Sequence, residues 1–178
     1  SPAISGDLVL KVRSSTPDYQ GFRISFAAGA LSPMYSCASG GSGPFSGGCF
    51  KRQFSVPSGS DFVEVRLPFS SFSDHWSPFT GDQTVTCADD PSVCPTERNL
   101  RGIQQFEIWA EGVGGDIHLE VLSISARPVQ LLEPAHALSS VIPLVTFDGA
   151  ESTTFTFYQM NDPVMVQLFI FFSNVTSN

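Results

Sequence analysis

Apolar and polar residues alternate with a period of two in several short segments of this chain, which is the pattern of half-buried β-strands. Gly, Pro, Ser and Asp separate these segments, and no amphipathic helical period extends beyond about two turns. The pattern predicts an all-β domain in which two antiparallel sheets pack as a sandwich. Strands are expected at residues 6–13, 22–26, 50–56, 62–68, 102–110, 116–125, 144–147 and 154–158.

The predicted core consists of apolar side chains that share one face of each of the first six strands. Sixteen phenylalanines, against two tryptophans and three tyrosines, fit such a core because Phe is favoured on pleated, half-buried surfaces. The 178 residues are enough for one domain with a substantial interior. The expected core residues are Leu8, Leu10, Phe22, Ile24, Phe54, Val63, Val65, Phe106, Ile108, Ile117, Leu119 and Val121.

The net charge of -8 and the pI of about 4.6 narrow the range of partners. An acidic protein repels phosphate backbones, and the sequence has no cluster of Lys and Arg to counter that repulsion. Nucleic-acid binding is therefore not expected. The apolar run at residues 166–172 is much shorter than the roughly 18 residues that a membrane-spanning helix needs, so no membrane span is predicted.

The four cysteines stand in two local pairs, Cys37 with Cys49 and Cys87 with Cys94. None of them forms a Cys-x-x-Cys motif or a Cys/His cluster, so the spacing disfavours a zinc site. The expected structure has two disulfides, each closing a loop of small or turn-forming residues, and such bridges would indicate a secreted protein. The alternative is four reduced thiols in a reducing compartment.

The strand at residues 102–110 carries the most distinctive polar face of the predicted sandwich. Glu107 and Trp109, continued by Glu111, share the side opposite the core because side chains alternate along a strand. A large aromatic ring among carboxylates indicates a contact surface for a partner, or a site that stacks on a sugar. The alternative is that Trp109 packs under a loop. Trp76, within "SDHWS", is the second candidate aromatic.

Three polar residues, Asp116, His118 and Glu120, share one face of the strand at 116–125. They could form a binding or metal site if a neighbouring strand joined them, and the alternative is a solvated outer face. No Gly-x-Ser-x-Gly motif is present, and the three histidines are scattered along the chain. We therefore expect no catalytic residue, no metal and no cofactor, and we keep His118 and Glu120 as candidate binding residues.

Three stretches, "VRLPFSSFSDHW", "IQQFEIWAEGVGGDIHLEVLSISA" and "FDGAESTTFTFYQMNDPVM", resemble the complex I intermediate-associated protein 30 family. The resemblance implies a galactose-binding-like jelly roll and a non-enzymatic assembly factor. It also implies a protein partner, such as a respiratory or photosynthetic complex subunit, and an organelle location, mitochondrion or plastid. A carbohydrate-binding module is the alternative, because fold does not determine function. Exposure of Trp109 and Trp76 in a groove would favour sugar, and their burial would favour a protein partner.

The order of these stretches differs from that of the family, where the Asn-Asp-Pro-Val-Met string lies near the start of the domain. Residues 1–126 resemble the back two-thirds of one module and residues 144–165 the front of a second, joined by a Pro-rich linker at 127–143. The tail at 166–178 departs from the family, and we favour a translated non-coding stretch. Two alternatives stay open: a divergent strand, or a permuted arrangement in which residues 144–165 supply the first module's missing strand.

Overall fold

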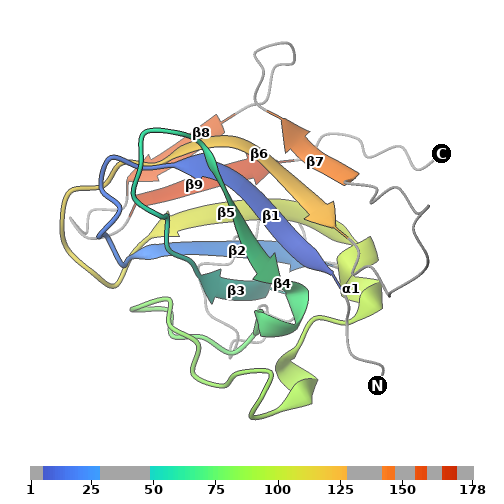
Figure 1. Cartoon of the computed structure of the whole chain (residues 1–178). Helices are drawn as coiled ribbons and strands as arrows, with labels where there is room; N and C mark the ends of the chain where they lie inside the picture. Colours follow the sequence, from blue (N-terminus) through green and yellow to red (C-terminus); the bar gives the residue numbers. More distant parts are fainter. Residues whose placement is uncertain (1–5, 29–48, 128–141, 147–154, 160–165, 172–178) are drawn as a thin grey trace.

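The computed structural model describes residues 6–28, 49–127, 142–146, 155–159 and 166–171, which form two antiparallel sheets packed together (Figure 1). One sheet has the order β4-β1-β6-β7 and the other the order β3-β2-β5-β9-β8. The expected β-sandwich is thus present, while its jelly-roll connectivity stays a prediction. The strands are β1 (Asp7–Arg13), β2 (Phe22–Ala28), β3 (Cys49–Gln53), β4 (Val63–Pro68), β5 (Ile103–Ala110), β6 (Glu120–Arg127), β7 (Ile142–Thr146), β8 (Phe155–Gln159) and β9 (Val166–Phe171).

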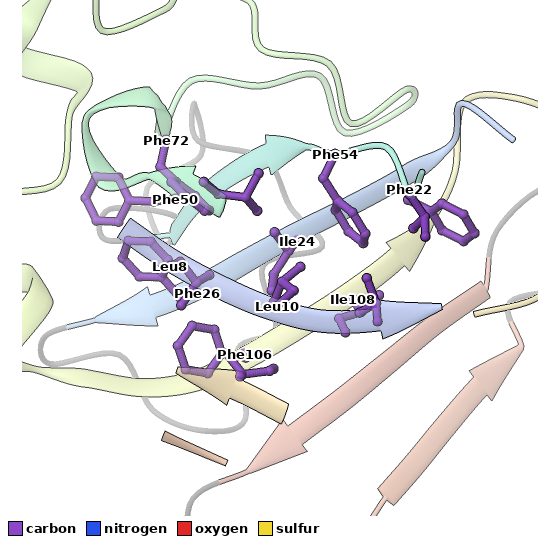
Figure 2. Close-up of a cluster of buried hydrophobic side chains, with 14 of the residues drawn as sticks. Leu8, Leu10, Phe22, Ile24, Phe26, Phe50, Phe54, Phe72, Phe106 and Ile108 are labelled. Atoms are coloured by element: carbon purple, nitrogen blue, oxygen red, sulfur yellow. The ribbon is translucent and has the colours of Figure 1, made fainter. Parts of the chain in front are cut away.

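The core lies between β1 of the first sheet and β2 and β5 of the second (Figure 2). The alternating apolar residues of these strands are buried as predicted, and Phe26 is the centre of an aromatic cluster. Its ring centroid lies 5.2 to 6.3 Å from those of Phe50, Phe69, Phe72 and Phe106. The predicted core residues toward the rim are only partly buried; these are Val63, Val65, Leu119 and Val121.

The prediction for Ile117 is wrong, because its side chain is 38% exposed and the sixth strand begins only at Glu120. Hydrogen bonds to the β1–β2 turn hold the preceding stretch out of the sheet. Ser14 Oγ donates to the carbonyl of His118 at 2.5 Å, and the amide of His118 donates to Thr16 Oγ1 at 3.0 Å. Side-chain partners replace the ladder bonds here, and apolar alternation does not reveal such a competition.

The connection between β4 and β5 carries the short helices η2 (Phe69–Ser71), η3 (Pro91–Val93) and α1 (Glu97–Arg101). Part of this connection joins the second sheet, because Lys51 of β3 exchanges backbone hydrogen bonds of 2.9 and 3.3 Å with Ser73. The segment that follows therefore crosses the outer face of that sheet. No helix among the residues that the structure describes has the length and hydrophobicity to span a membrane.

The last three strands extend both sheets. β7 pairs with β6 in the first sheet, and β9 lies between β5 and β8 in the second. β7 begins within the predicted linker, and β9 occupies the first half of the tail that we interpreted as non-coding. The division of the chain at residues 126, 143 and 165 into pieces of two modules stays a prediction.

Candidate functional site

The predicted polar face of β5 lies under the β4–β5 connection, residues 69–102, rather than at the surface, and we call this connection the cover. Trp109 is 1% exposed and Trp76 is 3% exposed, and Glu107 and Glu111 are buried as well. Trp76 comes from the β4–β5 connection and packs with Trp109 in a small cluster on the outer side of the sheet. The two tryptophans are therefore brought together, as a binding site would require, but they are not exposed in a groove. Of the alternatives that the sequence analysis left open for Trp109, the structure shows the one in which Trp109 packs under a loop.

Lys51 is the centre of this cluster. Its Nζ lies 3.7 Å from the ring centroid of Trp76 and 3.6 Å from that of Trp109, and it bonds Glu111 Oε1 at 2.7 Å. Each indole is also anchored: Trp109 Nε1 donates to Ser25 Oγ at 2.8 Å, and Trp76 Nε1 donates to a backbone carbonyl of β3 at 3.4 Å. We call Lys51, Trp76, Trp109 and Glu111 the lysine box.

Burial lowers the pKa of Lys51 to about 8, against the opposing effect of the Glu111 carboxylate. The ammonium is compensated by one ion pair and by the faces of two indole rings, which attract a cation. Lysine at this position has no access to solvent, since its side chain is 0% exposed. The box is consequently a cross-link that fastens the β4–β5 connection to the sheet, and not an open reactive site.

A second ion pair supports the same cover. Arg23 of β2, almost fully buried, donates to Asp82 Oδ1 at 2.6 Å, and Asp82 lies in the connection. Gly81 lies between the two pairs with a φ of +71°, and a side chain there would overlap the Glu111 carboxylate and the Arg23 side chain. The turn therefore needs glycine both for its backbone conformation and for space.

Replacing Gly81 by alanine should lower the free energy of unfolding by about 2 kcal/mol, because left-handed backbone and overlap with a buried ion pair act together. Gly114 is the matched control, because nothing lies within 4 Å of a side chain added there. Urea unfolding of both variants measures the difference. Equal stabilities of Gly81→Ala and Gly114→Ala would contradict this account of the turn.

His118 and Glu120 are not part of the lysine box. Their hydrogen bonds instead hold the end of β1 and the β1–β2 turn. Glu120 is paired with Arg13 through two hydrogen bonds of 2.8 and 2.7 Å, and these bonds lower the pKa of its carboxyl. His118 Nδ1 accepts from the amide of Ser15 at 3.0 Å. In the described part of the chain no three His, Cys, Asp or Glu side chains are grouped so as to hold a metal ion.

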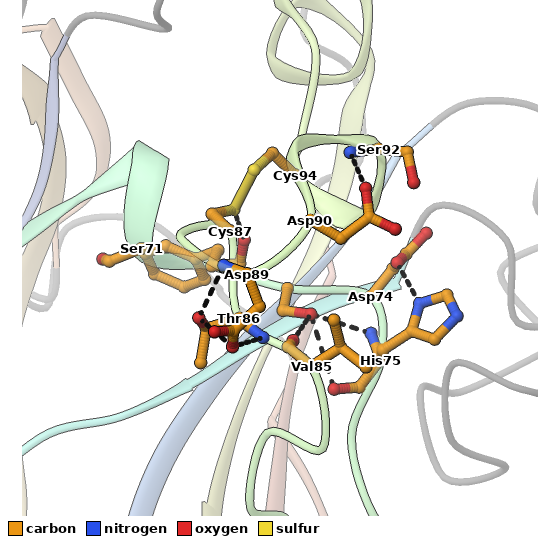
Figure 3. Close-up of a disulfide and its surroundings, with 12 residues drawn as sticks. Ser71, Asp74, His75, Val85, Thr86, Cys87, Asp89, Asp90, Ser92 and Cys94 are labelled. Carbon is orange, nitrogen blue, oxygen red and sulfur yellow. Dashed lines mark hydrogen bonds and ion pairs between the residues drawn. A yellow bond between two sulfur atoms is a disulfide. The ribbon is translucent and has the colours of Figure 1, made fainter.

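The structure pairs Cys87 with Cys94 as predicted, with Cα atoms 5.3 Å apart (Figure 3). The bridge lies within the acidic loop at residues 83–99, where Thr86 Oγ1 also donates to Asp89 Oδ2 at 2.6 Å. Cys49 is disulfide-bonded as well, and Cys37, its predicted partner, lies outside the described residues.

Replacing Cys87 and Cys94 together by serine should lower the free energy of unfolding by about 2 kcal/mol. The closed loop is short, and a short loop releases little chain entropy when it is opened. Thermal unfolding of the double variant beside the parent protein gives the measurement. A melting temperature equal to that of the parent would show that the bridge contributes nothing to stability.

The sequence reasoning missed a groove of about 820 Å³ beside the end of β3. One wall consists of the consecutive residues 52–55. The rest of the lining comes from Gln20, Leu67, Ser70, Ser71, Asp82, Gln83 and residues 86–88, and the Asp82 carboxylate among them is paired with Arg23. Arg52 projects into it and donates to Ser71 Oγ and, at 3.3 Å, to the carbonyl of Gln53. The sequence did contain a signal for this groove. Arg52 shares a strand face with the predicted core residue Phe54, and a charged side chain on a core-facing side must reach a polar partner or solvent. We call this pocket the β3 groove.

Exposed apolar side chains gather on loops at the opposite end of the sandwich from α1. Phe79 is 86% exposed, and Val113 is 38% exposed. Their loops touch, because a side chain at Gly112 would meet the carbonyl of Thr80. The Tyr19 hydroxyl fixes the second loop by donating to the carbonyl of Val113 at 3.0 Å. Sequence alternation gave no sign of this group, since both loops fall outside the predicted strands.

Comparison with known protein families, with curated proteins and with solved structures finds no match for this chain.

Proposed function

We propose that this chain is a non-enzymatic binding module that docks a protein partner, in the manner of an assembly factor. The observation that carries the proposal is Phe79, a large apolar side chain held in solvent by an ordered turn. Ser77 Oγ accepts from the amides of Phe79 and Thr80 at 3.2 and 3.3 Å, and the amide of Gly81 donates to the carbonyl of Ser77 at 2.8 Å. Exposed aromatic side chains on rigid supports are frequent anchors of protein interfaces.

The cover over the second sheet supports this proposal over carbohydrate binding. Sugar modules present tryptophan faces to solvent, whereas Trp76 and Trp109 enclose Lys51. The turn that carries Phe79 is fastened at its base by the Arg23–Asp82 ion pair, so the anchor is presented without a large cost in ordering. The resemblance to the complex I intermediate-associated protein 30 family implies the class of partner that we propose, a subunit of a respiratory or photosynthetic complex.

Site-specific photo-crosslinking tests the proposal. A photoreactive phenylalanine analogue at position 79 should give a discrete protein adduct in an extract of the native source, identified by mass spectrometry. The same analogue at Arg98, an exposed residue of α1 at the other end of the sandwich, is the control. A Phe79→Ser variant should weaken capture of that identified partner by roughly tenfold or more. Identical adducts from positions 79 and 98, or undiminished capture by Phe79→Ser, would overturn the proposal.

A further inference from the structure

The β3 groove faces the edge of a strand. Side chains alternate between the two faces of a sheet, so a pocket on one face is lined by every second residue. The β3 groove is lined instead by consecutive residues, Arg52 and Gln53 at the end of β3 and then Phe54 and Ser55, which places it along the outer edge of the chain where β3 ends. β3 is also the outermost strand of its sheet.

The backbone of Gln53 points into this groove. The amide and carbonyl of Lys51 bond Ser73, away from β2, and the amide of Phe54 donates to Phe22 on β2 at 3.0 Å. Backbone groups alternate in direction along a strand, so those of Gln53 point away from β2, as those of Lys51 do. Within the described part of the chain, the Gln53 amide has no backbone partner. The cover pairs with β3 at Lys51 and leaves the Gln53 amide open at the next outward position, while the Gln53 carbonyl accepts from Arg52 Nε at 3.3 Å.

Arg52 gives this open edge a chemical preference. The other cations of the described residues that are at least half-buried each have a carboxylate partner: Arg13, Arg23, Lys51 and Arg127. Arg52 is half-buried too, yet its partners in the described part are a hydroxyl and a carbonyl. Burial lowers the pKa of Arg52 with no carboxylate to oppose it. Residues 29–48, which precede β3, contain no Asp or Glu that could supply one.

We propose that the β3 groove binds an extended peptide segment that adds to the edge of β3 and places a Glu or Asp side chain against Arg52. The Gln53 amide would pair with the peptide backbone, and the guanidinium would move from the Gln53 carbonyl to the carboxylate, which releases that carbonyl for the peptide as well. Gln83 closes one end of the site, because its side-chain amide already donates to the carbonyls of Lys51 and Ser71 at 2.7 and 2.8 Å. This peptide site is separate from the Phe79 surface, so either can fail without the other.

The probe is a set of fluorescein-labelled octapeptides of Val and Thr with one central Glu, used with the full chain. Fluorescence anisotropy should show binding that weakens about tenfold or more when Gln replaces the Glu. An Arg52→Gln variant should bind both peptides alike, whereas Arg98→Gln, the control for charge alone, should keep the difference. N-methylation of alternate peptide amides should abolish binding, because it removes the backbone donors.

Several results would overturn the inference. These are equal binding of the Glu and Gln peptides by the parent protein, undiminished binding of the N-methylated peptide, or no binding of either peptide. Binding of oligogalacturonate with no binding of the peptides would assign the groove to acidic sugars instead. The peptide comparison needs no protein variant, so it decides the matter even if Arg52→Gln does not fold.

Discussion

Replacing Lys51 by methionine should lower the free energy of unfolding by about 3–5 kcal/mol, measured by urea unfolding at neutral pH. Methionine has a similar length, so the change removes the charge and leaves most of the volume. Glu111 is 1% exposed and bonds Lys51 at 2.7 Å, and it would stay buried without its cation. An uncompensated buried charge costs far more than the intact ion pair contributes.

A double variant separates charge from packing. Lys51→Met combined with Glu111→Gln removes both charges, so it should recover most of the stability lost in the single variant. If the double variant is as unstable as the single one, the loss comes from the packing of the two indoles rather than from the orphaned carboxylate.

The same lysine predicts a pH dependence with a definite sign. Burial lowers the pKa of Lys51 in the folded protein from 10.5 to about 8, so between these values the unfolded chain binds more protons than the folded one. The contribution of Lys51 to stability should therefore rise as the pH increases from about 8 to about 10.5, and it should be lost as the pH falls back through 8. The parent protein should show this component in unfolding curves, and Lys51→Met should lack it.

Deleting residues 166–178 should lower the melting temperature by roughly ten degrees or more. β9 pairs with β5 along six residues, from Ala110 with Val166 to Gln105 with Phe171, and β8 pairs with β9 at the edge of the same sheet. Its removal would open the edge of β5 and leave β8 without its neighbour in the sheet, at a cost of several kcal/mol.

A shorter deletion is the control for this truncation. Removing residues 172–178 keeps β9 complete, so the melting temperature should change little. A non-coding tail makes the opposite prediction, because deletion of all of 166–178 would then leave stability unchanged or improve solubility. Calorimetry of the two truncations decides between the interpretations.

The core-facing side of the strands could be predicted from the sequence, whereas the burial of their opposite side could not. Alternation placed Phe22, Ile24 and Phe26 on the core face of β2, where they are buried. It also implied a solvated opposite face, yet Arg23 and Ser25 are buried too. Arg23 is bonded to Asp82 and Ser25 to Trp109, which lie 59 and 84 positions away in the sequence, and no local pattern can reveal such partners.

The candidate site shows the same division. Glu107 and Trp109 could be selected from their strand, because a polar face with one large aromatic is visible in the period of two. Lys51 could not be joined to Glu111, since the two lie 60 residues apart in sequence. The polar face of β5 that we interpreted as a contact surface for a partner or a sugar is in part a contact between buried charges, and only the paths of the loops distinguish these cases.

The lysine box contains the only two tryptophans of the chain, Trp76 and Trp109. Tryptophan emission from this protein therefore has a single origin, the seam between the cover and the second sheet. If the cover detaches before the sandwich melts, emission will shift at a lower denaturant concentration than the β-sheet signal in circular dichroism. The intrinsic tryptophan fluorescence of the chain thus reports whether the cover is attached to the second sheet.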